Sequence, residues 1–196
     1  MFNVERAKDI PPSLLKRQSY SGQDVWDALS KMFYGKCYLC ETHEPGDLNV
    51  EHLKSHKGDG DLKFLCENLY FSCSRCNNVK LDKFDDILDC CGPDQNVFRL
   101  IKCLPPRMPY SGTLVIEAVV GDAQTLKTTE LLDRIFNGVH SPSKRIGAAN
   151  LRHKVYEQCE LLIKHVNKYF KCDSIDDEKR LAIEKIRHLI KRDQPY

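Results

Sequence analysis

The sequence lacks any long apolar run. No stretch of its 196 residues approaches the ~20 consecutive apolar residues that a membrane-spanning helix needs. The opening residues, MFNVERAKDIPPSLLKR, have no continuous apolar core of the kind found in a secretion signal. Internal repeats and low-complexity tracts are also absent. An apolar fraction of 41% and a charged fraction of 30% are ordinary for a globular protein. We therefore expect a cytoplasmic protein with a packed core and no membrane partner.

The chain also lacks a strong excess of charge of either sign. Its formal net charge of +2 is too small to indicate nucleic-acid binding by itself. The charge is nevertheless uneven, because residues 82–94 carry five aspartates and residues 144–192 are rich in lysine and arginine. These segments are either ordinary solvated faces or, for the basic one, a surface that follows a phosphate backbone.

Cysteine, by contrast, is abundant, with ten residues. Disulfide scaffolds belong mainly to short secreted chains, which this sequence does not resemble. Four of the cysteines form two C-x-x-C pairs, Cys37/Cys40 and Cys73/Cys76, with the spacing of zinc knuckles. Four thiolates suit a structural zinc ion in tetrahedral geometry. We expect the other six to be reduced and mostly buried: Cys66, Cys90, Cys91, Cys103, Cys159 and Cys172.

The segment between the two cysteine pairs contains polar residues that a purely structural zinc site does not need. It is longer than the ~15–20 residues of a common zinc ribbon, and it includes Glu51, His52 and Asn68. Asn77 follows the last cysteine directly, and Lys80 comes three residues later. Histidines His43 and His56 also lie nearby, and we expect both at the surface, with contact between His56 and substrate as the lesser alternative.

Hydrophobic periodicity predicts a mixed α+β protein. Pro11-Pro12 favours an extended arm over residues 1–20. Ser21 is expected to cap a helix that contains Val25, Leu29, Met32 and Phe33 and ends near Gly35. That helix should pack on the site. Three further elements are then expected: a strand over 48–53, a flexible loop over 57–61 and a helix over 73–83.

The second half of the sequence predicts a hairpin followed by helices. Residues 97–103 and 113–120 read as strands joined by the turn-rich segment 105–112. Helices are expected around 131–138, over 143–170 and over 181–190. Their apolar stripes are expected to be core: Leu151, Val155, Cys159, Leu162, Val166, Phe170, Leu181, Ala182, Ile186, Leu189 and Ile190.

Residues 37–83, with their order Cys-x-x-Cys, Glu-His, Asn-Leu and Cys-x-x-Cys-Asn-x-x-Lys, resemble the His-Asn-His (HNH) endonuclease family. The resemblance implies a ββα-metal fold, in which a hairpin and a helix hold one divalent cation. By position, His52 is the general base and Asn68 steadies the loop. Glu51 and Asn77 are then the cation ligands. Lys80 matches a basic residue often found after the knuckle, and it is either a solvated helix lysine or a residue that contacts substrate.

Two positions depart from the commonest family pattern. Glu51 stands where aspartate is usual, and Asn77 stands where the final histidine is usual. A carboxylate and an amide oxygen are hard ligands, so they favour Mg²⁺ or Mn²⁺ as the catalytic cation beside the structural Zn²⁺. The neighbours Glu51 and His52 can share one site only if the strand twists or ends there, because adjacent strand residues point to opposite faces.

The wider layout is similar to the HNH proteins of Septu-type and retron-associated antiphage systems (PtuB-like proteins). That resemblance implies a nuclease effector that works with an SMC-family ATPase of the PtuA type, with retron reverse transcriptase and msDNA as further partners. The expected organisation is an N-terminal arm and helix (1–36), an HNH ββα-metal core with its structural zinc knuckle (37–90), and a β-hairpin with a C-terminal helical region (91–196).

Three functional readings stay open at this stage. The first is a metal-dependent endonuclease that hydrolyses phosphodiester bonds in DNA or in an RNA such as tRNA. The second is a zinc-stabilised module that binds nucleic acid or a partner without catalysis. A toxin-like effector restrained by a partner differs from the first reading only in its regulation.

Overall fold

The structure is a computed structural model that describes residues 1–93, 96–108, 112–138, 142–171, 175–191 and 193–194. The side chains of residues 142–145 are outside this description. Asp94, Cys172 and residues 109–111 of the expected turn therefore lie outside the described residues. None of the helices in the described part of the chain is both long and apolar enough to cross a membrane.

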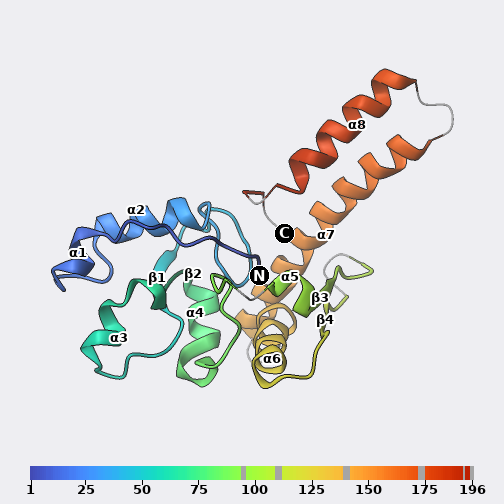
Figure 1. Ribbon diagram of the computed structural model, residues 1–196. Coiled ribbons are helices and arrows are strands. Elements are labelled where there is room, and N and C mark those ends of the chain that lie inside the picture. Colours follow the sequence, from blue (N-terminus) through green and yellow to red (C-terminus); the bar gives the residue numbers. More distant parts are fainter. Residues whose placement is uncertain (94–95, 109–111, 139–141, 172–174, 192, 195–196) are drawn as a thin grey trace.

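The molecule is mixed α+β, as expected, and its first half is built on one antiparallel hairpin. Strands β1 (Leu48–His52) and β2 (Leu69–Cys73) pair so that Glu51 faces Tyr70. All five residues of β2 are buried. Helix α2 (Gln23–Met32) and helix α4 (Ser74–Lys80) lie on the two sides of this hairpin (Figure 1). Strand β2 is therefore buried on both faces, whereas in β1 only Glu51 is fully buried.

Helix α2 packs against the hairpin through aromatic side chains. The Trp26 ring meets the Phe71 ring edge-on, with centroids 5.2 Å apart. The helix ends at Met32, and Gly35 then adopts a φ of +64° while its N–H donates to the Ser30 carbonyl at 2.8 Å. A left-handed conformation of this kind favours glycine and closes a helix C-terminus. The expected end near Gly35 is thus close to the observed one.

Three local expectations in the first half were wrong. Residues 1–20 are not wholly extended, because Pro12 starts a one-turn helix, α1 (Pro12–Leu15); proline's fixed φ suits the first turn of a helix. Gly22 rather than Ser21 caps α2, and no side chain contributes to that cap. The loop expected over 57–61 instead begins α3 (Gly60–Phe64), where the Asp59 carboxylate accepts from the N–H groups of Asp61 and Leu62.

Short helices also make up the chain just before β2 and just after it. A 3₁₀ turn, η1 (Cys66–Asn68), leads into β2. The helix expected over 73–83 is α4 followed by a second 3₁₀ turn, η2 (Leu81–Phe84). The boundary falls at Leu81, where φ is +47°.

A second hairpin follows. Strands β3 (Ile101–Leu104) and β4 (Val115–Ala118) pair antiparallel, as the sequence predicted. The first expected strand is shorter than predicted, since residues before it form one helical turn, α5 (Val97–Leu100). Two N–H groups, of Arg99 and Leu100, donate to the Asn96 carbonyl and turn the chain there.

Helix α6 (Ala123–Asn137) joins the two halves of the molecule, since it contacts α4, η2, β4 and α7. Its N-terminus is capped by Asp122, which accepts from the Thr125 N–H at 3.0 Å. Two of its C-terminal carbonyls accept hydrogen bonds from guanidinium groups. Arg75 of α4 donates to Ile135 O at 2.5 Å, and Arg152 donates to Phe136 O at 2.7 Å. Cations at the C-terminal end of a helix are electrostatically favourable.

The last two helices, α7 (Pro142–Phe170) and α8 (Asp176–Leu189), form an antiparallel pair that projects away from the rest of the molecule (Figure 1). Leu151 and Ala182 are buried. The expectation that the whole stripe is core was wrong for Phe170, Leu181 and Ile190, which are 74%, 54% and 65% exposed. The two helices pack on each other, so the outer part of each apolar face stays open.

The cysteine expectations are met in part. All nine cysteines in the described residues are free of disulfide bonds. Outside the two C-x-x-C pairs, Cys90 is the only fully buried cysteine among the described residues, whereas Cys66, Cys91 and Cys159 are half-buried and Cys103 is exposed. "Mostly buried" was therefore too strong.

Candidate functional site

The four cysteines of the two C-x-x-C pairs form one buried cluster, as predicted. Their sulfur atoms all lie within 4.8 Å of one another, and the Cys40 and Cys73 sulfurs are 3.9 Å apart. Zn–S bonds of about 2.3 Å in tetrahedral geometry place neighbouring sulfurs about 3.8 Å apart. The cluster can therefore hold a metal ion such as zinc.

Local backbone structure brings the first pair into position. In the turn that carries Cys37 and Cys40, the Cys37 N–H donates to Thr42 O at 3.1 Å and the Glu41 N–H donates to Cys37 O at 2.9 Å. Glu41 adopts a left-handed φ of 58°. The Tyr38 N–H donates to Phe71 O at 2.9 Å, which ties the turn to β2.

The second pair straddles the junction between strand and helix. Cys73 is the last residue of β2 and the N-cap of α4, and Cys76 lies in the first turn of α4. A metal bound by all four sulfurs would connect the turn before β1 to the β2–α4 junction. It would fix the hairpin and the helix as one unit.

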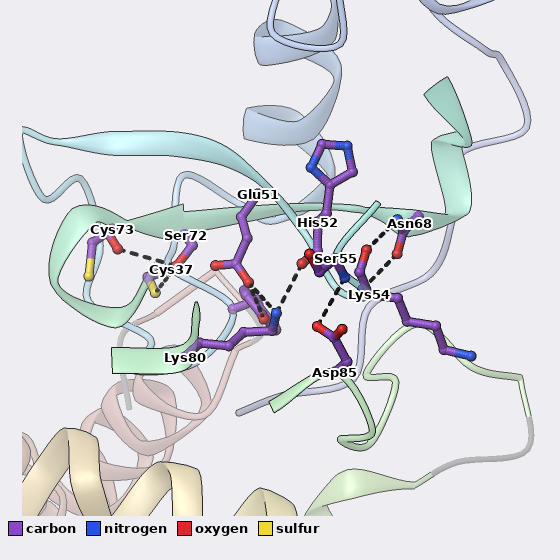
Figure 2. A network of polar contacts seen from close by, with 11 residues as sticks. Cys37, Glu51, His52, Lys54, Ser55, Asn68, Ser72, Cys73, Lys80 and Asp85 are labelled. Carbon is purple, nitrogen blue, oxygen red and sulfur yellow. Dashed lines mark hydrogen bonds and ion pairs between the residues drawn. The ribbon is translucent and has the colours of Figure 1, made fainter. Parts of the chain in front are cut away.

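Glu51 is buried on the side of β1 that faces α4 (Figure 2). Its Oε1 accepts from the Tyr38 hydroxyl at 3.1 Å and from Lys80 Nζ at 3.0 Å. Its Oε2 is also buried and has no hydrogen-bond partner among the described residues. Burial raises the pKa of Glu51, and the Lys80 ammonium opposes this change.

Lys80 is not a surface lysine, although it is the last residue of a short helix. Only 2% of its surface is exposed. Besides its ion pair with Glu51, its Nζ donates to the His52 carbonyl at 3.0 Å. This arrangement differs from the expectation that Lys80 contacts substrate, because the ammonium is turned inward between α4 and the end of β1.

The His52 side chain lies on the other side of β1 from the Glu51 carboxylate (Figure 2). Its Nε2 is 3.0 Å from the Lys63 carbonyl oxygen. A carbonyl can only accept, so Nε2 carries the proton and Nδ1 has the free electron pair. Nδ1 makes no bond within the described residues and is not a buried atom. Burial of the ring lowers the pKa of His52 below its ordinary value.

Two aromatic side chains lie beside His52, and one of them, Tyr20, was not foreseen from the sequence. The rings of Tyr20 and His56 each lie with centroids 4.8 Å from the His52 ring. His56 Nδ1 accepts from the Gly58 N–H at 3.1 Å, so its Nε2 carries the proton in the neutral form. His56, expected to be an ordinary surface residue, is half-buried beside His52. No spacing rule in the sequence relates Tyr20 to the hairpin.

Asn68 holds the loop that follows His52. Its Oδ1 accepts from the Lys54 N–H at 2.8 Å, and its Nδ2 donates to Lys54 O at 2.9 Å and to Leu62 O at 3.1 Å. Asn68 itself is 4% exposed. These contacts join Asn68 to the backbone at two points of the loop. Asp85 adds a further tether, since its Oδ1 accepts from the Ser55 N–H at 2.9 Å (Figure 2).

Asn77 is half-buried on α4, one turn before Lys80. Residues three apart on a helix share a face. Its side chain makes no hydrogen bond to any part of the chain that the structure describes, so it is not joined to Glu51. Of the predicted residues, the structure thus joins Glu51, Lys80 and the His52 backbone, and it directs the His52 ring elsewhere.

The four-cysteine cluster generates the first prediction. Cys76→Ser should lose the bound metal and unfold the hairpin–helix unit, because zinc sites of this kind contribute ~10–16 kcal/mol and whole domains are stable by only ~5–15 kcal/mol. Metal content by mass spectrometry and thermal unfolding measure both effects. Cys103→Ser, at an exposed position, is the matched control. A stable, metal-free Cys76→Ser protein would contradict the structural role.

Asn68 generates a second prediction. Asn68→Ala should destabilise the protein by ~1–3 kcal/mol, since it leaves buried backbone groups of the loop unpaired. Amide hydrogen exchange should also become faster at Lys54, whose N–H loses its acceptor. Asn78→Ala, at an exposed position on α4, should change neither quantity. Unaltered exchange at Lys54 would show that Asn68 does not hold the loop.

Comparison with known proteins does not assign the chain to a family. No protein-family model matches the chain, and no curated protein matches it either. The function is therefore argued from the geometry of the site.

Proposed function

We propose that this chain is an HNH-type endonuclease that hydrolyses phosphodiester bonds of nucleic acid, with His52 as the general base. The observation that carries the proposal is the His52 ring. A backbone carbonyl fixes its orientation through Nε2, and its Nδ1 is left open. A base for proton abstraction needs this combination of a fixed ring and a free electron pair.

The surrounding architecture supports the proposal. Strand β1, strand β2 and helix α4 follow one another around the cysteine cluster, which is the order of elements in a ββα-metal unit. His52 is the last residue of β1, and the loop after it is tied down by Asn68. His52 therefore lies where the rigid hairpin meets the loop.

The proposed reaction begins when His52 Nδ1 takes a proton from a water molecule. The water oxygen forms a bond to phosphorus, and the bond from phosphorus to the 3′ oxygen breaks. The 3′ oxygen leaves with the bonding electron pair and takes a proton from solvent, while His52 returns the abstracted proton to solvent. The lowered pKa of His52 keeps the imidazole neutral at pH 7, as this step requires. The half-buried His56 ring lies beside His52, and its Nε2–H would donate to a phosphate oxygen.

Glu51 and Asn77 would hold the Mg²⁺ or Mn²⁺ ion of such a nuclease. The unpaired Glu51 Oε2 and the unbonded Asn77 amide supply hard oxygen ligands of the kind these cations prefer. When bound, the cation would stabilise negative charge on the phosphate and leaving oxygens. Glu51 is oriented for this role by its hydrogen bond from Tyr38.

The antiphage role is the finer part of the proposal. A nuclease effector of the Septu type would need a surface for its SMC-family ATPase. The projecting α7–α8 pair offers exposed apolar side chains, such as Ile163, Phe170 and Leu181, that suit a protein partner. DNA and tRNA remain the two substrate classes to be compared.

A zinc-stabilised binding module is the second candidate. The observation that favours it is the opposed orientation of Glu51 and His52, with Glu51 already paired to Lys80. In such a module the Glu51–Lys80 pair would only stabilise the hairpin, and His52 would have no catalytic role.

The test of the proposal is cleavage of plasmid DNA and total tRNA in Mg²⁺, by the full chain alone and with an SMC-family ATPase partner. His52→Ala should lower the cleavage rate at least ~100-fold, the usual contribution of a general base, while zinc content and thermal stability stay near those of the wild type. His188→Ala, at an exposed position on α8, is the control. Wild-type cleavage by His52→Ala would rule out the proposed mechanism, and the absence of cleavage by every preparation would favour the binding module.

The pH dependence provides a further prediction. A general base works in its neutral form, and burial lowers the pKa of His52 below 6.5. The single-turnover cleavage rate should therefore be more than half-maximal at pH 6.5 and reach half its maximum only at a lower pH. A rate that is half-maximal at pH 6.5 or above would show that a different group, or an unshifted histidine, controls the reaction.

A further inference from the structure

Lys80 places a positive charge beside the carboxylate that the proposed nuclease would use for its cation. Lys80 Nζ is 3.0 Å from Glu51 Oε1, and the two side chains are only 3% and 4% exposed. The same Nζ donates to the His52 carbonyl at 3.0 Å. One ammonium group thus connects the candidate cation ligand to the backbone of the candidate base (Figure 2).

The two oxygens of the Glu51 carboxylate differ in their hydrogen bonding. Oε1 accepts from both Lys80 and Tyr38, whereas Oε2 is buried without a partner in the described part of the chain. A buried carboxylate needs a counter-ion, and an unpaired buried oxygen leaves that need only partly met. The carboxylate therefore has one buried oxygen without a hydrogen bond among the described residues and one oxygen paired with an internal cation.

We infer that Lys80 is the internal counter-ion of the cation site: its ammonium holds Glu51 while the site has no metal ion and must release the carboxylate when a divalent cation binds. The inference rests on the proposed function, because it describes the regulation of the same site. Lys80 is then a positioning residue. It does not reach substrate, since its side chain is enclosed between α4 and β1.

The hydrogen bond from Lys80 to the His52 carbonyl means that movement of Lys80 would also affect the candidate base. If Lys80 moves away from Glu51, its hydrogen bond to His52 O must lengthen or change direction, because the same Nζ donates to both acceptors. Binding of the cation would thus change the backbone at the end of β1, where the His52 ring is attached. The enzyme without cation would be held in a different local geometry from the enzyme with cation.

The test is Mn²⁺ binding to the zinc-loaded full chain, followed by electron paramagnetic resonance without any substrate. Lys80→Met keeps the aliphatic volume and removes the competing charge, so it should bind Mn²⁺ at least ~10-fold more tightly than the wild type, a difference typical of a coupling between sites. Adding Glu51→Gln to Lys80→Met should abolish the gain. Lys83→Met, at an exposed position three residues later, should bind as the wild type does.

Equal Mn²⁺ affinity of the wild type and Lys80→Met would overturn the inference, and so would a folded Lys80→Met protein that binds no Mn²⁺. Lys80→Met leaves Glu51 buried without its counter-ion, so its folding must be checked. If it does not fold, Mg²⁺ titration of the wild type replaces the comparison, with the Lys80 ammonium followed by NMR. A slowly exchanging ammonium signal that Mg²⁺ removes supports the exchange, and a signal that saturating Mg²⁺ leaves unchanged refutes it.

The two proposals fail separately. The nuclease proposal is wrong if no cleavage depends on His52, whatever the Mn²⁺ affinities are. The counter-ion inference is wrong if Lys80→Met and the wild type bind Mn²⁺ equally well, even if the wild type cleaves nucleic acid.

Discussion

The convergence of four cysteine sulfurs is the constraint on which the rest of the structure depends. The two pairs come from a turn before β1 and from the junction of β2 with α4, so a metal bound between them closes a long loop of chain. A clip that closes a long loop removes much of the disorder of the unfolded chain. Between the pairs the sequence can then carry a short hairpin of only five residues per strand and still hold it rigid.

Strand alternation determines what this rigid hairpin can do. Adjacent residues of β1 point to opposite faces, so the Glu51 carboxylate enters the space beside α4 while the His52 ring meets Tyr20 and His56. The two faces communicate through the His52 backbone, whose carbonyl accepts from Lys80. If this hairpin belongs to a nuclease, the phosphate must lie on the His52 face of β1. The positive charge that stabilises the reaction must then reach the phosphate from the Glu51 face, around the C-terminal end of the strand.

The parts that the sequence predicted are those set by spacing along the chain. The cysteine pairs, the strand expected over 48–53 and the long helix α7 follow from local patterns, whereas the role of Asn68 was implied only by the resemblance to HNH endonucleases. The parts that it did not predict depend on tertiary contact. Lysines are almost never fully buried, so nothing in the sequence marked Lys80 as an internal counter-ion. Likewise, a helix stripe does not reveal whether a neighbour covers it, and for Phe170 none of the described residues does so fully.

The central claim is that the His52 imidazole removes the proton from the attacking nucleophile. Chemical rescue tests it most directly: His52→Gly opens a space beside Tyr20 and His56, and added imidazole can take the place of the missing ring. The account predicts that the variant cuts nucleic acid only when imidazole is present, at the same positions as the wild type. Full cutting by His52→Gly without imidazole would contradict the claim.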